Sequence, residues 1–159
     1  MRRGINLGTT LAVIMITNNH YYIVNVGDTR IYEVSSDVKQ LTKDHTFIAY
    51  EVKMGHMTEE QAKHDKRKNI LLQCIGASDE IFPDYCFGNA DADAVYVLCS
   101  DGLHHELQDD EIRDYFRSEH SKDRESITQQ ILKLVDLCKS RQESDNITVG
   151  VVKTLNGSK

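Results

Sequence analysis

Short apolar runs of five or six residues recur along this chain, and each is followed by residues that favour turns. Runs of that length, rich in branched side chains, are typical of β-strands, because helices need longer periodic segments. The N-terminal third holds three of them, at residues 11–16, 21–26 and 30–34, and the first is unbroken enough to predict a buried strand. Polar turn residues separate the first two, which predicts a hairpin. Residues 38–41 predict a short fourth strand.

Three further strands are expected in the rest of the chain. Residues 95–99 form a continuous apolar run that ends abruptly at Ser100, which predicts a central strand. Residues 81–87 predict an edge strand, because Pro83 lacks the amide hydrogen that an interior strand donates. Residues 147–152 form the last predicted strand.

Helical signals lie in the middle and in the C-terminal part of the chain. Thr58 and Gln61 fit a capping box at the start of a short helix. A second helix is predicted over 110–116 with Asp109 as its N-cap. A third is predicted over 123–140, where apolar side chains recur at helical spacing. Strands first, followed by helices mixed with isolated strands, favour an α+β fold with a largely antiparallel sheet.

The length of 159 residues suits one domain. The formal net charge of −6 argues against binding to bulk nucleic acid or to an anionic membrane, both of which need clustered Lys and Arg. No apolar run reaches the roughly 20 residues that a membrane-spanning helix needs. The first residues lack the long apolar region and the cleavage site of a signal peptide. We therefore expect a cytoplasmic protein without a nucleic-acid or membrane partner.

One basic cluster, at residues 63–68, has two interpretations, a solvated loop or a phosphate-binding patch, and the solvated loop is the simpler. The four cysteines form no C-x-x-C pair, so a zinc site is not expected. Cys99 and Cys138 lie within apolar periodic segments. They are predicted to be small core residues.

Three aspartates share a position next to a predicted strand. Asp28 follows a strand and a glycine, Asp101 follows the predicted central strand, and Asp145 precedes the last strand. A strand end can hold a carboxylate toward solvent, and hard cations such as Mg²⁺ or Mn²⁺ bind a few carboxylates together with waters. Each aspartate alone is better explained as a turn residue that bonds to its own backbone. Together they make a metal site a hypothesis to test.

Five short motifs occur in order along the chain. They are G-T-T-L at 8–11, V-G-D-T-R-I-Y at 26–32, L-T-K-D-H-T at 41–46, L-C-S-D-G-L at 98–103 and S-D-N-I-T-V at 144–149. In this order they resemble the successive motifs of the protein phosphatase 2C family, the metal-dependent serine/threonine phosphatases, and most closely a bacterial branch. Residues 54–76 resemble the flap region of that family. The resemblance extends from Gly8 to about Val152.

The resemblance implies a sandwich of two antiparallel β-sheets flanked by helices, with a metal cluster at one end. Asp101 and Asp145 match ligands of a central metal pair, and Asp28 matches a ligand of a third metal. Such enzymes use two, and in some members three, Mn²⁺ or Mg²⁺ ions to activate the water that attacks the phosphoryl group. The implied substrate is a phosphoserine or phosphothreonine protein, made by a serine/threonine kinase. Residues 1–159 would form one partial domain, with a flap at about 46–75.

Two features depart from the family pattern. The chain has no D-G-x-G-G stretch, so the N-terminal portion that carries a metal-bridging aspartate and a phosphate-clamping arginine is expected to be absent. Four residues after Asp101, where many members have Asp or Asn, this chain has His105. A neutral histidine binds Mn²⁺ better than Mg²⁺, which makes His105 a further candidate ligand. His104 and His105 are equally explained as surface residues at the start of a helix.

These departures leave three functions open. The chain is expected to act as a serine/threonine phosphatase by family resemblance. The alternatives are a catalytically inactive binding or regulatory module with the same fold, and an interaction domain that binds metal for structural reasons only. Loss of the N-terminal strands would leave sheet edges unpaired, which predicts self-association.

Overall fold

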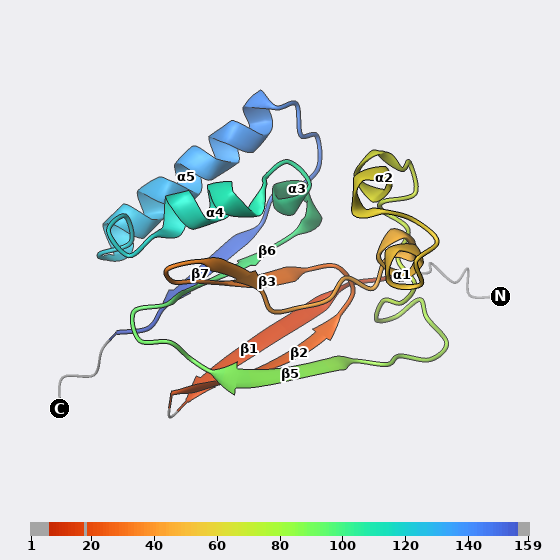
Figure 1. Cartoon of the computed structure of the whole chain (residues 1–159), viewed down its shortest axis with the longest axis horizontal. Coiled ribbons are helices and arrows are strands. Elements are labelled where there is room, and N and C mark those ends of the chain that lie inside the picture. The colour runs from red at the N-terminus through yellow and green to blue at the C-terminus, as the bar shows by residue number, and fades with distance from the viewer. Residues whose placement is uncertain (1–6, 18, 156–159) are drawn as a thin grey trace.

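Two antiparallel β-sheets lie face to face in this computed structural model, which describes residues 7–17 and 19–155 (Figure 1). The strand order is β1-β2-β5 in the first sheet and β4-β3-β6-β7 in the second. The first sheet consists of β1 (Leu11–Thr17), β2 (His20–Val26) and β5 (Asp84–Asn89). The second consists of β3 (Arg30–Val34), β4 (Val38–Gln40), β6 (Val95–Cys99) and β7 (Val149–Lys153). The arrangement confirms the predicted two-sheet sandwich.

Five helices accompany the sheets in the described part of the chain. They are α1 (Phe47–Lys53), α2 (Glu59–His64), α3 (Asp101–His104), α4 (Asp109–Phe116) and α5 (Arg124–Ser140). α4 and α5 lie over the outer face of the second sheet, whereas α1 and α2 pack together at one end of the sandwich (Figure 1). None of the described helices combines the length and the apolar character needed to cross a lipid bilayer.

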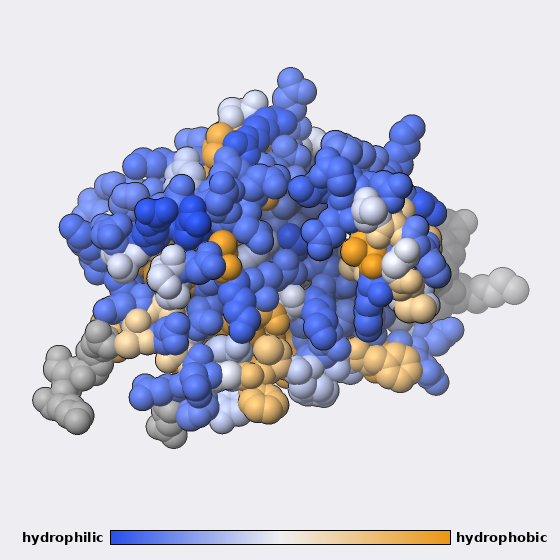
Figure 2. All heavy atoms as spheres, viewed as in Figure 1, coloured by the Kyte–Doolittle hydropathy of each residue, from blue (hydrophilic) through white to orange (hydrophobic). Residues whose placement is uncertain are grey.

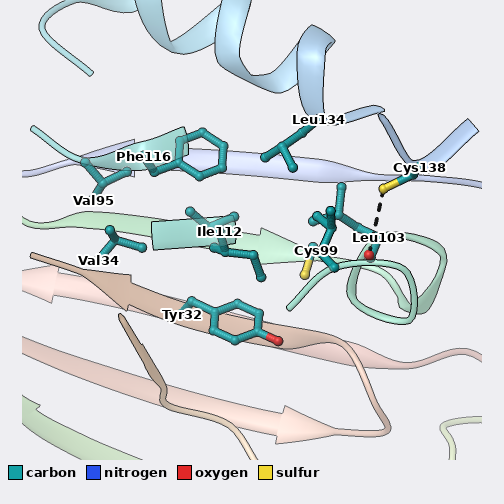
Figure 3. Packing of buried hydrophobic residues seen from close by; sticks show 11 residues of the cluster. Tyr32, Val34, Val95, Cys99, Leu103, Ile112, Phe116, Leu134 and Cys138 are labelled. Atoms are coloured by element: carbon teal, nitrogen blue, oxygen red, sulfur yellow. Dashed lines mark hydrogen bonds between the residues drawn. The ribbon is translucent and has the colours of Figure 1, made fainter. Parts of the chain in front are cut away.

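One hydrophobic core fills the space between the second sheet and its helices (Figure 3). Side chains alternate along a strand, so every second residue of β3 and β6, such as Tyr32, faces α4 and α5. Phe116 and Leu134 meet this face from the helices and are fully buried. Cys99 and Cys138 belong to the same core as buried free thiols, which confirms their predicted role.

A second core lies between the two sheets, where Tyr21, Ile23 and Ile31 are buried together. It also holds one carboxylate. Glu33 accepts a hydrogen bond of 2.6 Å from the hydroxyl of Tyr96, its direct partner in the β3–β6 register. Burial and this hydrogen bond raise the pKa of Tyr96, so the phenol stays protonated and remains a donor. A polar pair is thereby satisfied inside the sandwich.

Several predicted boundaries are confirmed or shifted for local reasons. β5 begins at Asp84, directly after Pro83, and is an edge strand as predicted. The N-cap of α4 is Gln108 rather than Asp109, because the Gln108 amide donates to the carboxylate of Glu111 in a capping box. α1 and α3 are helices that hydrophobic periodicity does not indicate, since one is seven residues long and the other four.

The first strand differs from its prediction. The unbroken apolar run predicts burial, but every second side chain of β1 points to solvent. Leu11, Val13 and Met15 are 43%, 47% and 56% exposed. They lie on the outer face of the first sheet, which no described helix covers (Figure 1). The prediction of a buried strand is therefore wrong for this face of β1.

Candidate metal centre

Asp28 lies in the three-residue connection, 27–29, that carries the chain from β2 in the first sheet to β3 in the second. Gly27 has a φ of +106°, and a Cβ added there would lie 2.3 Å from Thr10 Cγ2. This turn therefore requires glycine, on backbone and on steric grounds. Asp28 is 8% exposed, and its carbonyl accepts a hydrogen bond of 3.1 Å from His104 Nε2.

Asp101 is the first residue of α3, two residues after the last residue of β6. Its Oδ1 accepts a hydrogen bond of 2.9 Å from the Gly102 amide. Burial, and then the negative charge of Asp101, raise the pKa of Asp28 to about 6, and Arg30 offsets only part of this effect. Two carboxylates that repel one another in this way are an arrangement that a divalent cation stabilises.

Asp145 is exposed in the loop between α5 and β7. Three hydrogen bonds between Ser100 and this loop hold it beside Asp101. The Ser100 amide donates to the carbonyl of Thr148, and its hydroxyl donates to the carbonyl of Asn146 and accepts from the Thr148 amide. Asp101 and Asp145 consequently lie on adjoining segments. β7 begins at Val149, two residues later than predicted.

His104 is 5% exposed, so the surface interpretation is wrong for this residue. A carbonyl only accepts, so Nε2 carries the ring hydrogen that bonds to Asp28. The other ring nitrogen, Nδ1, is buried and has no hydrogen-bond partner among the described residues. Burial lowers the pKa of His104 to about 2, and the ring is therefore neutral. It meets the ring of His105 edge to face, with centroids 4.7 Å apart.

His105 is partly buried and faces charges of both signs. Burial, followed by the positive charge of Lys68, lowers its pKa, while Asp101 and Glu143 act in the opposite direction. The neutral imidazole that results is the form that binds metal ions. Lys68 belongs to the basic cluster at 63–68, so one member of that cluster acts on the candidate site.

The four predicted residues gather at one end of the sandwich without forming a closed ligand set. Asp28 and Asp101 interact through their charges, and Asp145 lies on the adjoining loop. The charge of Asp101 also acts on the pKa of His105. Within residues 7–17 and 19–155, no three His, Cys, Asp or Glu side chains are close enough together to hold an ion.

His45 is a polar residue at this end of the molecule that was not among the predicted site residues. Its Nδ1 accepts hydrogen bonds from the Gly27 amide at 3.1 Å and from Gln73 Nε2 at 2.8 Å. The D-H-T motif at 44–46 contains it, but nothing in the sequence indicates that its ring reaches a turn 18 residues earlier.

Comparison with known proteins identifies the family and the fold. The family model for protein phosphatase 2C matches residues 5–136. Protein phosphatase PhpP of Streptococcus pneumoniae is 35% identical over 147 residues, which cover 92% of this chain and 58% of that protein. The serine/threonine phosphatase PstP/Ppp of Mycobacterium tuberculosis superposes with a TM-score of 0.81 at 29% identity, covering 94% of this chain and 61% of that one. The catalytic domain of PstP in complex with two manganese ions superposes with a TM-score of 0.75, also at 29% identity, over 94% of this chain and 60% of that one.

This chain therefore spans about three fifths of the length of the relatives that it matches. The family match covers most of the chain, and the solved structures share its two-sheet architecture over nearly all of it. The chain belongs to the protein phosphatase 2C family.

Proposed function

We propose that this chain forms part of a metal-dependent phosphatase that hydrolyses phosphoserine and phosphothreonine in proteins, the products of serine/threonine kinases. The observation that carries the proposal is the neighbouring pair of carboxylates, Asp28 and Asp101, at one end of the sandwich. Their repulsion contributes to the raised pKa of Asp28, so a bound cation would relieve it. The printed names of the relatives, a protein phosphatase and a serine/threonine phosphatase, support the substrate class.

The side chains at this end suit a hard divalent cation. Asp28, Asp101 and Asp145 offer carboxylate oxygens, which both Mg²⁺ and Mn²⁺ prefer, and His105 would add a neutral nitrogen that favours Mn²⁺. When bound, such ions supply a water of lowered pKa and neutralise charge on the phosphoryl oxygens. Asp101 and Asp145 would hold the central pair, and Asp28 a third ion. The two manganese ions in the PstP complex support the number of at least two.

We assign residues 46–75 to a flap beside this site. The β-bridge between Thr46 and Leu71 closes the base of the segment, which contains α1 and α2. Near its end, Lys68 directs a positive charge toward His105. A cation in that position would attract a phosphate dianion to the carboxylates, which otherwise repel it.

Calorimetric titration of the 159-residue protein with Mn²⁺ tests the metal assignment. We expect binding in the wild type that is at least tenfold weaker in Asp101→Asn and in Asp145→Asn. The control is Asp136→Asn, which removes an exposed carboxylate from α5 and should leave the affinity unchanged. Equal affinities in the wild type and both site variants would contradict the assignment.

Turnover of p-nitrophenyl phosphate with Mn²⁺ tests the reaction. We expect poor turnover by the 159 residues alone, because the family's bridging aspartate and clamping arginine are not among them, and lost positioning alone costs about 10²-fold. The longest natural polypeptide containing these residues should turn over the substrate, and Asp101→Asn should abolish this. Metal binding without turnover in either polypeptide would favour the inactive regulatory module.

A further inference from the structure

His45 lies where the two ends of the 46–75 segment meet. The chain leaves His45 toward α1 and returns to it at Leu72 and Gln73. The Leu72 amide donates to the carbonyl of His45 at 2.8 Å, and Gln73 Nε2 donates to its ring Nδ1 at 2.8 Å. His45 therefore contacts both strands of chain at the base of the proposed flap, next to the Thr46–Leu71 bridge.

The same ring atom also holds the turn that carries Asp28. The Gly27 amide donates to His45 Nδ1 at 3.1 Å, and the Gly27 carbonyl accepts from the His45 amide at 3.0 Å. Two donors point at Nδ1, so this atom carries no hydrogen, and Nε2 carries it instead. Nε2 faces the carboxylate of Asp84 at 3.5 Å, which favours that tautomer. The ring is 11% exposed, so water competes little for these contacts.

Gln73 is itself held on both sides of its amide group. Its Oε1 accepts from the Phe82 amide at 2.8 Å, and its Nε2 donates to the Phe82 carbonyl at 2.9 Å as well as to His45. A continuous path of hydrogen bonds thus runs from the segment before β5, through Gln73 and His45, to Gly27. Asp28 is the next residue, and its own carbonyl is anchored separately by His104.

We propose that His45 is a positioning residue that links the base of the flap to the Asp28 turn and holds Asp28 in place for metal binding. This inference rests on the proposed metal site. Without the acceptor at Nδ1, the Gly27 amide loses its partner, and the turn keeps the backbone bond from the His45 amide to the Gly27 carbonyl and the bond from His104 to the Asp28 carbonyl. Groups hydrogen-bonded directly to a metal ligand typically change metal affinity by about 10–100-fold. His45 bonds to the residue before the ligand, so we expect the lower end of that range.

A pair of substitutions separates positioning from general stability. His45→Asn places an amide oxygen near the position of Nδ1 and preserves an acceptor, whereas His45→Leu removes it. We expect Mn²⁺ affinity to fall at least tenfold in His45→Leu and to stay within about threefold of wild type in His45→Asn. Ser121→Ala is the control, because it removes a buried hydroxyl that donates to the Phe116 carbonyl, far from the site. It should lower stability and leave Mn²⁺ affinity unchanged.

Amide hydrogen exchange of the metal-free protein gives a second readout. Exchange at Gly27 should accelerate at least tenfold in His45→Leu and return toward wild type in His45→Asn, with Val97 in β6 unchanged in both. Equal Mn²⁺ affinities in all His45 variants, with weaker binding in Asp28→Asn, would overturn the positioning role and leave the metal site intact. If the wild type binds no Mn²⁺, the proposed metal site fails. Unchanged exchange at Gly27 in His45→Leu would overturn the link itself.

Discussion

The two sheets of the sandwich differ in what lies over their outer faces. The β4-β3-β6-β7 sheet is covered by α4 and α5, and its residue Val97 is 0% exposed. The β1-β2-β5 sheet has no described helix over its outer face, where Phe87 is 77% exposed (Figure 1). Figure 2 shows hydrophobic surface along the side of the molecule where β5 lies. The large apolar side chains on this face are Leu11, Val13, Met15, Tyr22, Tyr85 and Phe87.

The two sheets therefore have different roles: the β4-β3-β6-β7 sheet supports the candidate site, and the β1-β2-β5 sheet has an exposed apolar face. Asp101 follows β6 and Asp145 precedes β7, so both belong to the sheet that is covered on two faces. Asp28 lies on the connection between the two sheets. The candidate metal centre is therefore built on the better-buried half of the molecule. The other half offers its apolar face to further contacts, because apolar surface of this extent favours association.

The largest expected effect on stability is the difference between substitutions of a buried and an exposed phenylalanine. Phe116→Ala should lower the free energy of unfolding by about 3–5 kcal/mol, because it leaves a cavity between α4 and the second sheet. Phe87→Ala should change it by less than about 0.5 kcal/mol, since its side chain is exposed. Urea denaturation of both variants at micromolar concentration measures the difference. Similar losses would mean that the outer face of the first sheet is covered in solution.

The polar pair inside the sandwich tests how far burial extends between the sheets. Tyr96→Phe removes the donor to Glu33 and leaves a carboxylate without that partner, at an expected cost of about 1–3 kcal/mol. Tyr22→Phe, on the exposed face, is the matched control and should be neutral. Chemical denaturation at pH 7.5 compares the two, and a neutral result for Tyr96→Phe would show that water reaches Glu33.

Asp28, in the connection between the two sheets, should make the stability of the protein depend on pH. Its pKa is raised to about 6 in the folded protein, so folding favours the protonated carboxyl. The stability that it contributes is present below about pH 4 and is lost as the pH rises to about 6. In EDTA, Asp28→Asn should be more stable than wild type at pH 7.5, by on the order of 1–3 kcal/mol, because burial disfavours the charged carboxylate and the amide carries no charge. The gap should close near pH 4, and denaturation curves at both pH values measure it.

Added Mn²⁺ should reverse that order, because it stabilises the wild type and has less charge to bind in Asp28→Asn. A persistent advantage of Asp28→Asn in Mn²⁺ would argue against Asp28 as a ligand.

The smallest effect on stability is expected for substitutions on the exposed outer face of the β1-β2-β5 sheet, which should instead change self-association. Met15, Tyr22 and Phe87 lie opposite one another across the three strands. We expect the 159-residue protein to self-associate at high concentration through this face, and Phe87→Ser to reduce it. Analytical ultracentrifugation over a concentration series measures the shift. Unchanged association in Phe87→Ser would direct attention to the free edges of β1 and β7 instead.

The strands and helices could be predicted from the sequence where the pattern of apolar residues reflects which side chains are buried. The strand at 95–99 is a continuous apolar run and the helix at 124–140 has a clear helical period, and the predicted bounds of both agree with the structure to within one residue. The prediction for β1 was wrong because an unbroken apolar run indicates burial on both faces of a strand. In the described structure only one face of β1 packs against the rest of the protein. α1 was not predicted, because a helix of seven residues with no buried side chain shows little hydrophobic periodicity.

The sequence supplies candidate site residues one by one, but it does not supply the contacts between them. The motifs single out Asp28, Asp101 and Asp145 as candidates, and the structure places Asp28 between β2 and β3, Asp101 at the start of α3 and Asp145 in the loop before β7. The reach of His45 to Gly27 depends on how the chain returns after β4, which local patterns do not encode. The burial of His104 likewise depends on a carbonyl 76 residues away in sequence.

The connection at 27–29 also limits how the length of this chain can vary. One extra residue there would displace Asp28 and shift one sheet past the other by roughly 3.3 Å, the spacing of residues along a strand. The turn between α1 and α2 is the opposite case, because Gly55 has open space around it. An affinity tag or a labelled loop inserted at Gly55 should therefore be tolerated, whereas the same insertion beside Gly27 should not.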